Sequence, residues 1–161
     1  MKLNNFFKLV IAVSISELAG VIGSIFTISA IPGWYATLAK PELSPPSWLF
    51  GPVWITLYAL MGVSLFLIWE INPSEARSGE RRRAVALFFI QLSLNAIWSI
   101  VFFGLRSPLG ALVVIIFLWL AIVGTMIAFF KISRPAAYLL APYLLWVSFA
   151  AYLNYSIWTL N

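Results

Sequence analysis

Long apolar runs, separated by short breaks, dominate the chain. Five such runs are present, and an apolar helix needs about 20 residues to cross a bilayer. None alternates with the period of two that a barrel strand shows, and each exceeds the ~10 residues that such a strand needs. The pattern predicts an all-α membrane protein, a bundle of five transmembrane helices. The predicted spans are approximately residues 6–30, 48–69, 84–105, 109–130 and 136–160.

The breaks between these runs carry turn or charge signals. They are Pro32-Gly33, Pro45-Pro46, the charged stretch Glu70–Arg83, Ser107-Pro108 and Arg134-Pro135. We expect the charged stretch to be a solvated loop and Ile31–Ser47 to be the longest irregular segment. Most of the chain lies in the apolar runs, so residues 1–161 are predicted to form a single five-span domain.

Lysine and arginine are distributed unevenly between the two ends of the predicted spans. Lys40 and Arg106 lie at one end. Eight lie at the other: Lys2, Lys8, Arg77, Arg81, Arg82, Arg83, Lys131 and Arg134. Because cytoplasmic loops are enriched in these residues, we expect a cytoplasmic N-terminus and, after five spans, a C-terminus on the outside. The segment Ile31–Ser47 would then lie outside, at the mouth of any site.

Composition agrees with a lipid environment and removes several kinds of chemistry. Hydrophobic residues make up 63% of the chain and charged residues 9%, whereas soluble domains are about 45–50% apolar and about 25% charged. Cysteine and histidine are absent, which excludes disulfides, thiol nucleophiles and the usual soft metal ligands. We predict no metal site and no resident cofactor. The net charge of +5 lies in connectors and termini, which fits membrane orientation rather than nucleic-acid binding.

Aromatic and carboxamide side chains recur at helical spacing within three of the predicted spans. Positions spaced four, three and four apart share one face of a helix. The three stripes are Gln91, Asn95, Trp98 and Phe102; Trp54, Tyr58, Met61 and Leu65; and Trp146, Ala150, Leu153 and Ile157. Carboxamides facing lipid would lack partners, so Gln91 and Asn95 should point inward. The stripes indicate either a pocket for a large planar apolar ligand or ordinary packing with hydrogen bonds between helices.

The first and fifth spans contain further unusual residues. A charged side chain at mid-membrane costs about 2.5–3.5 kcal/mol, so Glu17 should be protonated or paired, with either a functional role or a bond to a neighbouring helix. Pro142 cannot donate to the carbonyl of Tyr138 and should bend the fifth span. Small residues recur every four positions on the first span, which predicts close packing within the bundle or between subunits. They are Ala12, Ser16, Gly20 and Ser24.

Several residues around these stripes form longer blocks. The first connector and second span hold Trp34-Tyr35, Leu38, Lys40-Pro41, Pro45-Pro46, Trp48, Phe50-Gly51-Pro52-Val53-Trp54, Tyr58 and Met61-Gly62. The later spans hold Gln91-Leu92-Ser93-Leu94-Asn95 with Trp98-Ser99 and Phe102-Phe103-Gly104, and Pro142-Tyr143 with Trp146, Phe149-Ala150 and Leu153-Asn154. In this order the blocks resemble the tryptophan-rich sensory protein family, which includes the mitochondrial translocator protein. The resemblance covers nearly the whole chain.

The resemblance implies a five-helix bundle, often a homodimer, whose pocket accepts porphyrins and opens toward the loop between the first two helices. On matching positions it implies Trp34 and Tyr35 over the pocket, with walls from the second, third and fifth helices. Together with the stripes, it gives a ligand-binding set of Trp34, Tyr35, Pro45, Trp54, Tyr58, Gln91, Asn95, Trp98, Trp146, Ala150 and Asn154. The expected partners are a porphyrin or other planar apolar molecule, membrane lipid and a second copy of the chain.

Three functions follow from this resemblance and from the residues. The first is an integral membrane receptor or carrier for protoporphyrin IX, haem and related apolar ligands, in tetrapyrrole or stress sensing. Without histidine or cysteine, only weaker iron donors such as Met61 or Tyr58 remain, so binding should depend on stacking and burial. The second is light-dependent porphyrin degradation, for which the family implies Trp34 and Trp146 as catalytic residues. The third is a small proton-coupled transporter using Glu17, although no inverted repeat is visible.

One pattern of the eukaryotic family members is incomplete in this chain. Their cholesterol-recognition pattern places a basic residue after a tyrosine near the end of the fifth helix. Here Tyr152 and Tyr155 are followed by no lysine or arginine through Asn161. Cholesterol transport is therefore not expected.

Overall fold

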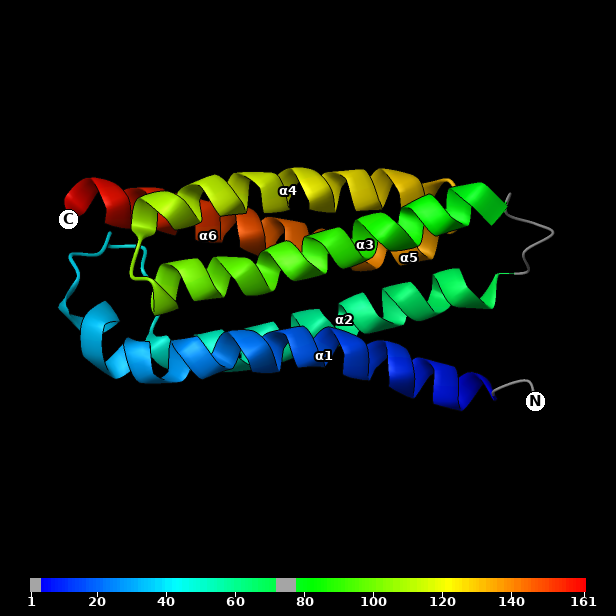
Figure 1. Ribbon diagram of the computed structural model, residues 1–161, viewed down its shortest axis with the longest axis horizontal. Helices are drawn as coiled ribbons and strands as arrows, with labels where there is room; N and C mark the ends of the chain where they lie inside the picture. Colours follow the sequence, from blue (N-terminus) through cyan, green and yellow to red (C-terminus); the bar gives the residue numbers. More distant parts are fainter. Residues whose placement is uncertain (1–3, 72–77) are drawn as a thin grey trace.

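Long apolar helices make up most of the protein in the computed structural model, which describes residues 4–71 and 78–161 (Figure 1). The elements are α1 (Asn5–Ala30), η1 (Ile31–Tyr35), η2 (Ser47–Leu49), α2 (Phe50–Glu70), α3 (Ser78–Ser99), η3 (Ile100–Gly104), α4 (Pro108–Phe130), α5 (Arg134–Leu139) and α6 (Ala141–Leu160). They form five segments long and apolar enough to cross a membrane: Asn5–Tyr35, Ser47–Glu70, Ser78–Gly104, Pro108–Phe130 and Arg134–Leu160. The predicted all-α bundle of five transmembrane helices is confirmed.

Short capped turns join the last three spans. The Ser107 hydroxyl accepts a hydrogen bond from the Gly110 amide at 3.2 Å, and the Ser133 hydroxyl accepts one from the Ala136 amide at 3.4 Å. Each serine caps a helix that has a proline in its first turn, where the missing N–H costs nothing. Arg106, with φ of 51°, reverses the chain before α4. These turns make successive spans antiparallel.

The spans pack in a closed ring around an apolar core. α1 packs on α2 and α3, while α4 packs on α3, α5 and α6. α2 completes the ring mainly through α5 and has few contacts with α3 across the bundle. The core contains the fully buried side chains of Met61, Phe88 and Tyr143, whereas large apolar side chains such as Ile28 and Leu145 are exposed on the outside. An exposed apolar surface of this kind fits lipid as the solvent.

Three of the four small residues predicted on the first span, Ala12, Ser16 and Gly20, lie at close contacts within the bundle. Ala12 and Ser16 are fully buried. Gly62 of α2 lies against the backbone of Val13, so closely that an added Cβ would overlap it. Farther along α1, a Cβ on Gly20 would lie 2.5 Å from the ring of Tyr58. The small side chains therefore let α1 and α2 approach within the bundle.

Two of the breaks predicted between spans are partly helical in the structure. The charged stretch Glu70–Arg83 is not a loop throughout, because α3 already begins at Ser78 and includes the three arginines of this stretch that lie in the described residues. Helical backbone also continues through Pro32-Gly33 as η1, with one non-helical residue, Gly33, at a kink. The irregular connector is correspondingly shorter than Ile31–Ser47. Polar side chains can extend a helix beyond the apolar core of a membrane, so hydropathy marks the core and not the helix end.

The fifth span is broken as Pro142 predicts. α5 ends at Leu139 and α6 begins at Ala141. The Leu140 amide donates to the carbonyl of Ala137 at 3.1 Å instead of to that of Ala136. The freed Ala136 carbonyl accepts a hydrogen bond from the buried Ser64 hydroxyl at 2.7 Å. The kink thus ties the fifth span to α2.

Candidate functional site

Two π-helical turns bring aromatic side chains together at the end of the bundle opposite the N-terminus. Trp34 and Tyr35 lie on η1, and Phe102 and Phe103 lie on η3. The ring centroids of Trp34 and Phe102 are 5.6 Å apart, and those of Tyr35 and Phe103 are 5.8 Å apart. A π-turn inserts an extra residue into a helix and redirects its side chains, and such turns are frequent at functional sites.

Below this aromatic cluster, a cavity of about 390 Å³ lies between α1, α2, the end of α3 and α6. α1 and η1 contribute Glu17, Gly20, Val21, Gly23, Ser24, Thr27, Ile28 and Ile31. The other elements contribute Ser47, Phe50, Gly51, Trp54, Ile55, Tyr58, Trp98, Ser99, Phe103, Trp146 and Ala150. Val21, Ile28 and Ile55 are 56%, 71% and 62% exposed, so the cavity reaches the outer surface of the bundle between α1 and α2.

Flat rings form much of the cavity wall. Trp54 stacks on Tyr58 with ring centroids 5.5 Å apart, and Trp98 stacks on Phe102 at 5.3 Å. Trp146 meets Phe50 edge to face at 6.3 Å. Because each ring is braced by another, the wall presents aromatic faces in fixed orientations.

Hydrogen bonds between helices hold these rings from behind. The Tyr58 hydroxyl donates to Asn95 Oδ1, and Asn95 Nδ2 donates to the Tyr143 hydroxyl at 3.0 Å. Trp98 Nε1 donates to Asn154 Oδ1 at 3.0 Å, and Asn154 Nδ2 donates to the carbonyl of Pro108 at 2.7 Å. Asn95 therefore joins two tyrosine rings through its oxygen and its nitrogen, whereas Asn154 holds the Trp98 ring through its oxygen and the start of α4 through its nitrogen.

The structure brings five of the predicted ligand-binding residues to the cavity wall. They are Trp54, Tyr58, Trp98, Trp146 and Ala150. The other six lie elsewhere: Trp34 and Tyr35 in the aromatic cluster, Pro45 in the connector, and Asn95, Asn154 and Gln91 buried within the bundle. Neither polar atom of the Gln91 side chain has a hydrogen-bond partner among the described residues.

Several lining residues were outside the predicted set. Gly20 and Ser24 belong to the small-residue stripe of the first span, which indicated helix packing but also leaves room beside that helix. Phe50 and Gly51 belong to the block that carries the family resemblance. The sequence patterns therefore singled out all four residues. They did not show whether such a residue packs closely against a neighbouring helix or lines a cavity.

Glu17 is the charged residue of the cavity wall. It lies on α1, one residue after the buried Ser16 and three residues before Gly20, and its side chain is partly exposed. An ion pair joins Lys8, near the start of α1, to Glu70 on α2 and does not involve Glu17. Glu17 thus lies beside open space within the bundle, and both possibilities for its carboxyl stay predictions.

Comparison with known proteins identifies the family. Residues 12–159 match the TspO/MBR family. The chain is 46% identical over 153 residues to a tryptophan-rich protein TspO of Chlorobaculum tepidum, with 95% of each chain covered. It is 44% identical over 160 residues to a protein of the same name from Archaeoglobus fulgidus, covering 98% of this chain and 99% of the relative.

A eukaryotic relative matches over a similar length. The human translocator protein is 40% identical over 143 residues, which cover 87% of this chain and 82% of the relative. The five membrane spans and these matches agree in extent, since the family match runs from the first span to the last. This chain is a multi-pass membrane protein that belongs to the TspO/MBR family.

Proposed function

We propose that this protein is an integral membrane receptor or carrier that binds porphyrins in the cavity between α1, α2, α3 and α6. The observation that carries the proposal is a wall with three indole rings, Trp54, Trp98 and Trp146, around a mostly apolar space. Ligand sites commonly measure about 300–1,000 Å³ and combine apolar walls with few polar groups. The volume of about 390 Å³ suits a flat ligand held partly within the cavity and partly at its opening.

Two features suit a tetrapyrrole in particular. Its macrocycle offers a large apolar face for stacking, and its propionates avoid burial by pointing toward the polar end of the site. Lys40 lies at that end, with its ammonium 5.0 Å from the centre of the Tyr35 ring. Within the described residues, the indole N–H groups of Trp54 and Trp146 donate no hydrogen bond, which leaves both available to a ligand.

Iron contributes little to this binding mode. The Tyr58 hydroxyl is engaged with Asn95, and Met61 is fully buried outside the cavity wall. These two candidate iron donors are thus poorly placed. A free-base porphyrin should bind about as tightly as haem.

A titration of the purified protein with protoporphyrin IX tests the proposal. Binding is followed by the absorbance of the porphyrin, so that variants with different tryptophan contents are comparable. Ala150→Leu fills the cavity beside Trp146 and should raise the Kd by roughly tenfold or more, which is about 1.4 kcal/mol. Trp119→Phe is the control, because Trp119 lies on α4 and donates to Ser148 outside the cavity wall.

The proposal fails if Ala150→Leu, at an unchanged unfolding temperature, binds protoporphyrin IX as tightly as the parent. It also fails if Trp119→Phe abolishes binding while Ala150→Leu does not. Equal affinity for haem and free-base porphyrin would support binding by stacking. A strong preference for haem would contradict it.

Light-dependent porphyrin degradation is a second candidate, favoured by the place of Trp146 on the cavity wall. An indole in contact with a photoexcited porphyrin can donate an electron, whereas phenylalanine preserves the stacking surface but is a much poorer donor. Trp146→Phe should therefore retain most binding and slow bleaching under illumination in air. Trp34 lies against Phe102 and outside the lining, so Trp34→Phe should slow bleaching less. Equal bleaching by the parent and both variants would exclude this activity.

A further inference from the structure

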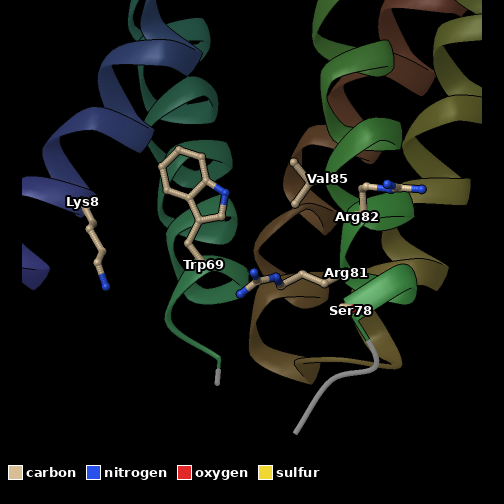
Figure 2. A pocket seen from close by; sticks show the side chains of 6 residues that line it. All are labelled: Lys8, Trp69, Ser78, Arg81, Arg82 and Val85. Atoms are coloured by element: carbon tan, nitrogen blue, oxygen red, sulfur yellow. The ribbon is translucent and has the colours of Figure 1, made fainter. Parts of the chain in front are cut away.

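A second hollow, of about 580 Å³, lies at the other end of the bundle, and Figure 2 shows the side chains that line it. Three helices contribute to it: α1 through Lys8, α2 through Trp69, and α3 through Ser78, Arg81, Arg82 and Val85. We refer to it as the basic pocket. None of its lining residues lines the cavity of about 390 Å³, so it is a separate feature of the fold.

The basic pocket combines positive charge with an apolar wall. Figure 2 shows the Arg81 side chain reaching from α3 toward α2 and the Trp69 ring projecting into the space between the helices. Arg81 Nη1 donates to the carbonyl of Ile71 at 3.3 Å. A guanidinium has five N–H donors, so most of those on Arg81 remain available to an anion. The pocket therefore suits a ligand with an anionic oxygen group beside an apolar body.

Its place at the end of the spans favours a lipid over a soluble anion. Tryptophan prefers the headgroup level of a bilayer, and basic pockets between transmembrane helices bind acidic headgroups. Phe6 and Phe7, next to Lys8 in the sequence, are 64% and 57% exposed and would face acyl chains. A free phosphate would make the same contacts with the cations but would leave the wall formed by Trp69 and Val85 unused.

We propose that the basic pocket binds the phosphate of an anionic phospholipid between Lys8 and Arg81, with the glycerol and upper acyl chain against Trp69 and Val85. Glu70 opposes this binding. Its carboxylate forms an ion pair of 2.8 Å with Lys8 and so competes with the lipid phosphate for the same ammonium. Binding should therefore tighten when that carboxylate is neutralised, a result that a purely structural ion pair would not give.

Native mass spectrometry of the full chain, released from nanodiscs, tests this proposal. The probes are phosphatidylglycerol, phosphatidylcholine and soluble glycerol 1-phosphate. The parent should retain one phosphatidylglycerol in preference to phosphatidylcholine. Arg81→Gln should weaken that retention roughly fivefold, the factor that one basic residue contributes near an anionic surface. Arg83→Gln is the matched control, since Arg83 is exposed on the same turn of α3 but does not line the pocket.

Glu70→Gln keeps the test independent of folding, because loss of structure cannot produce a gain of binding. It should retain phosphatidylglycerol roughly fivefold more tightly than the parent. Equal losses in Arg81→Gln and Arg83→Gln would overturn the proposal in favour of a general surface charge. Equal retention of both lipids, weaker binding by Glu70→Gln, or complete displacement by an equal concentration of glycerol 1-phosphate would overturn it as well.

Discussion

Gly62 lies where α2 meets the backbone of Val13 on α1. A methyl group at this position would overlap backbone, which cannot move aside as a flexible side chain can. Gly62→Ala should therefore force the two helices apart and lower the free energy of unfolding by about 1–3 kcal/mol, the usual cost of overpacking. Thermal unfolding in detergent measures the change.

Gly124 provides a matched control for that substitution. It lies within α4, and an added Cβ would meet nothing within 4 Å. Gly124→Ala should raise stability by roughly 0.5–1 kcal/mol, because alanine loses less conformational freedom than glycine in a helix. Similar effects of the two substitutions would contradict a special role for the contact between Gly62 and Val13.

The carboxyl of Glu17 distinguishes binding from transport. If the protein is a receptor or carrier, Glu17→Gln should fold normally and still bind protoporphyrin IX, since the amide preserves the shape of the side chain. If proton coupling drives transport, the same change should abolish uptake into vesicles that depends on a pH gradient while leaving the unfolding temperature unchanged. Uptake assays with both proteins separate the two outcomes.

The sequence predicted that the carboxamide side chains point into the bundle, but not that two of them hold aromatic rings in place instead of lining the cavity. The cost of exposing an amide to lipid predicted that Gln91 and Asn95 point inward, and both are 1% exposed. Asn95 and Asn154 hold the rings of Tyr58 and Trp98 from behind instead of lining the cavity. Helical spacing specifies a face, and only the packing of the neighbouring helices decides which side of a ring meets open space.

At the level of the helices, Ser64 compensates for the break in the fifth span. Its hydroxyl donates to the carbonyl of Ala136, which the kink at Leu140 leaves without its helical donor. Ser64→Ala should leave that buried carbonyl unpaired and lower stability by about 1–3 kcal/mol. Thermal unfolding in detergent again provides the measurement.

Ser16→Ala is the control for Ser64→Ala. The Ser16 hydroxyl is equally buried but donates, at 3.2 Å, to the carbonyl of Ala12 within its own helix. That carbonyl lies in the regular part of α1 and retains its backbone partner, so the loss should be smaller. Equal destabilisation by the two substitutions would mean that the kink does not depend on Ser64.

The number and order of the helices follow from hydropathy, whereas their ends do not. The apolar runs identified all five spans, and Pro142 indicated the break between α5 and α6. The charged start of α3 at Ser78 and the π-turn η1 were not expected. Helix formation outside the apolar core depends on local backbone hydrogen bonds, which polar residues satisfy as well as apolar ones.

The whole molecule carries an asymmetry of charge that predicts its orientation. Figure 1 shows that α1 and α3 begin, and α4 passes into α5, at the end of the bundle that holds the N-terminus. These segments carry six basic residues among those described: Lys8, Arg81, Arg82, Arg83, Lys131 and Arg134. Lys40, in the connector before α2, and Arg106, in the turn before α4, belong to the other end. Lys2 and Arg77 fall outside the described residues. A reporter fused after Asn161 should be active on the outside of the membrane. A cytoplasmic signal would reverse the orientation and place the aromatic cluster inside.

The opening of the cavity between α1 and α2 lies on the apolar outer surface of the bundle, which faces lipid. A ligand that enters there arrives from the bilayer, so the concentration that the site experiences is a mole fraction in lipid and not a molarity in water. Empty vesicles added at fixed protein and ligand would dilute the ligand within the membrane and weaken its apparent affinity in proportion. Two ligands that fit the cavity equally well would then differ in apparent potency by the ratio of their partition coefficients.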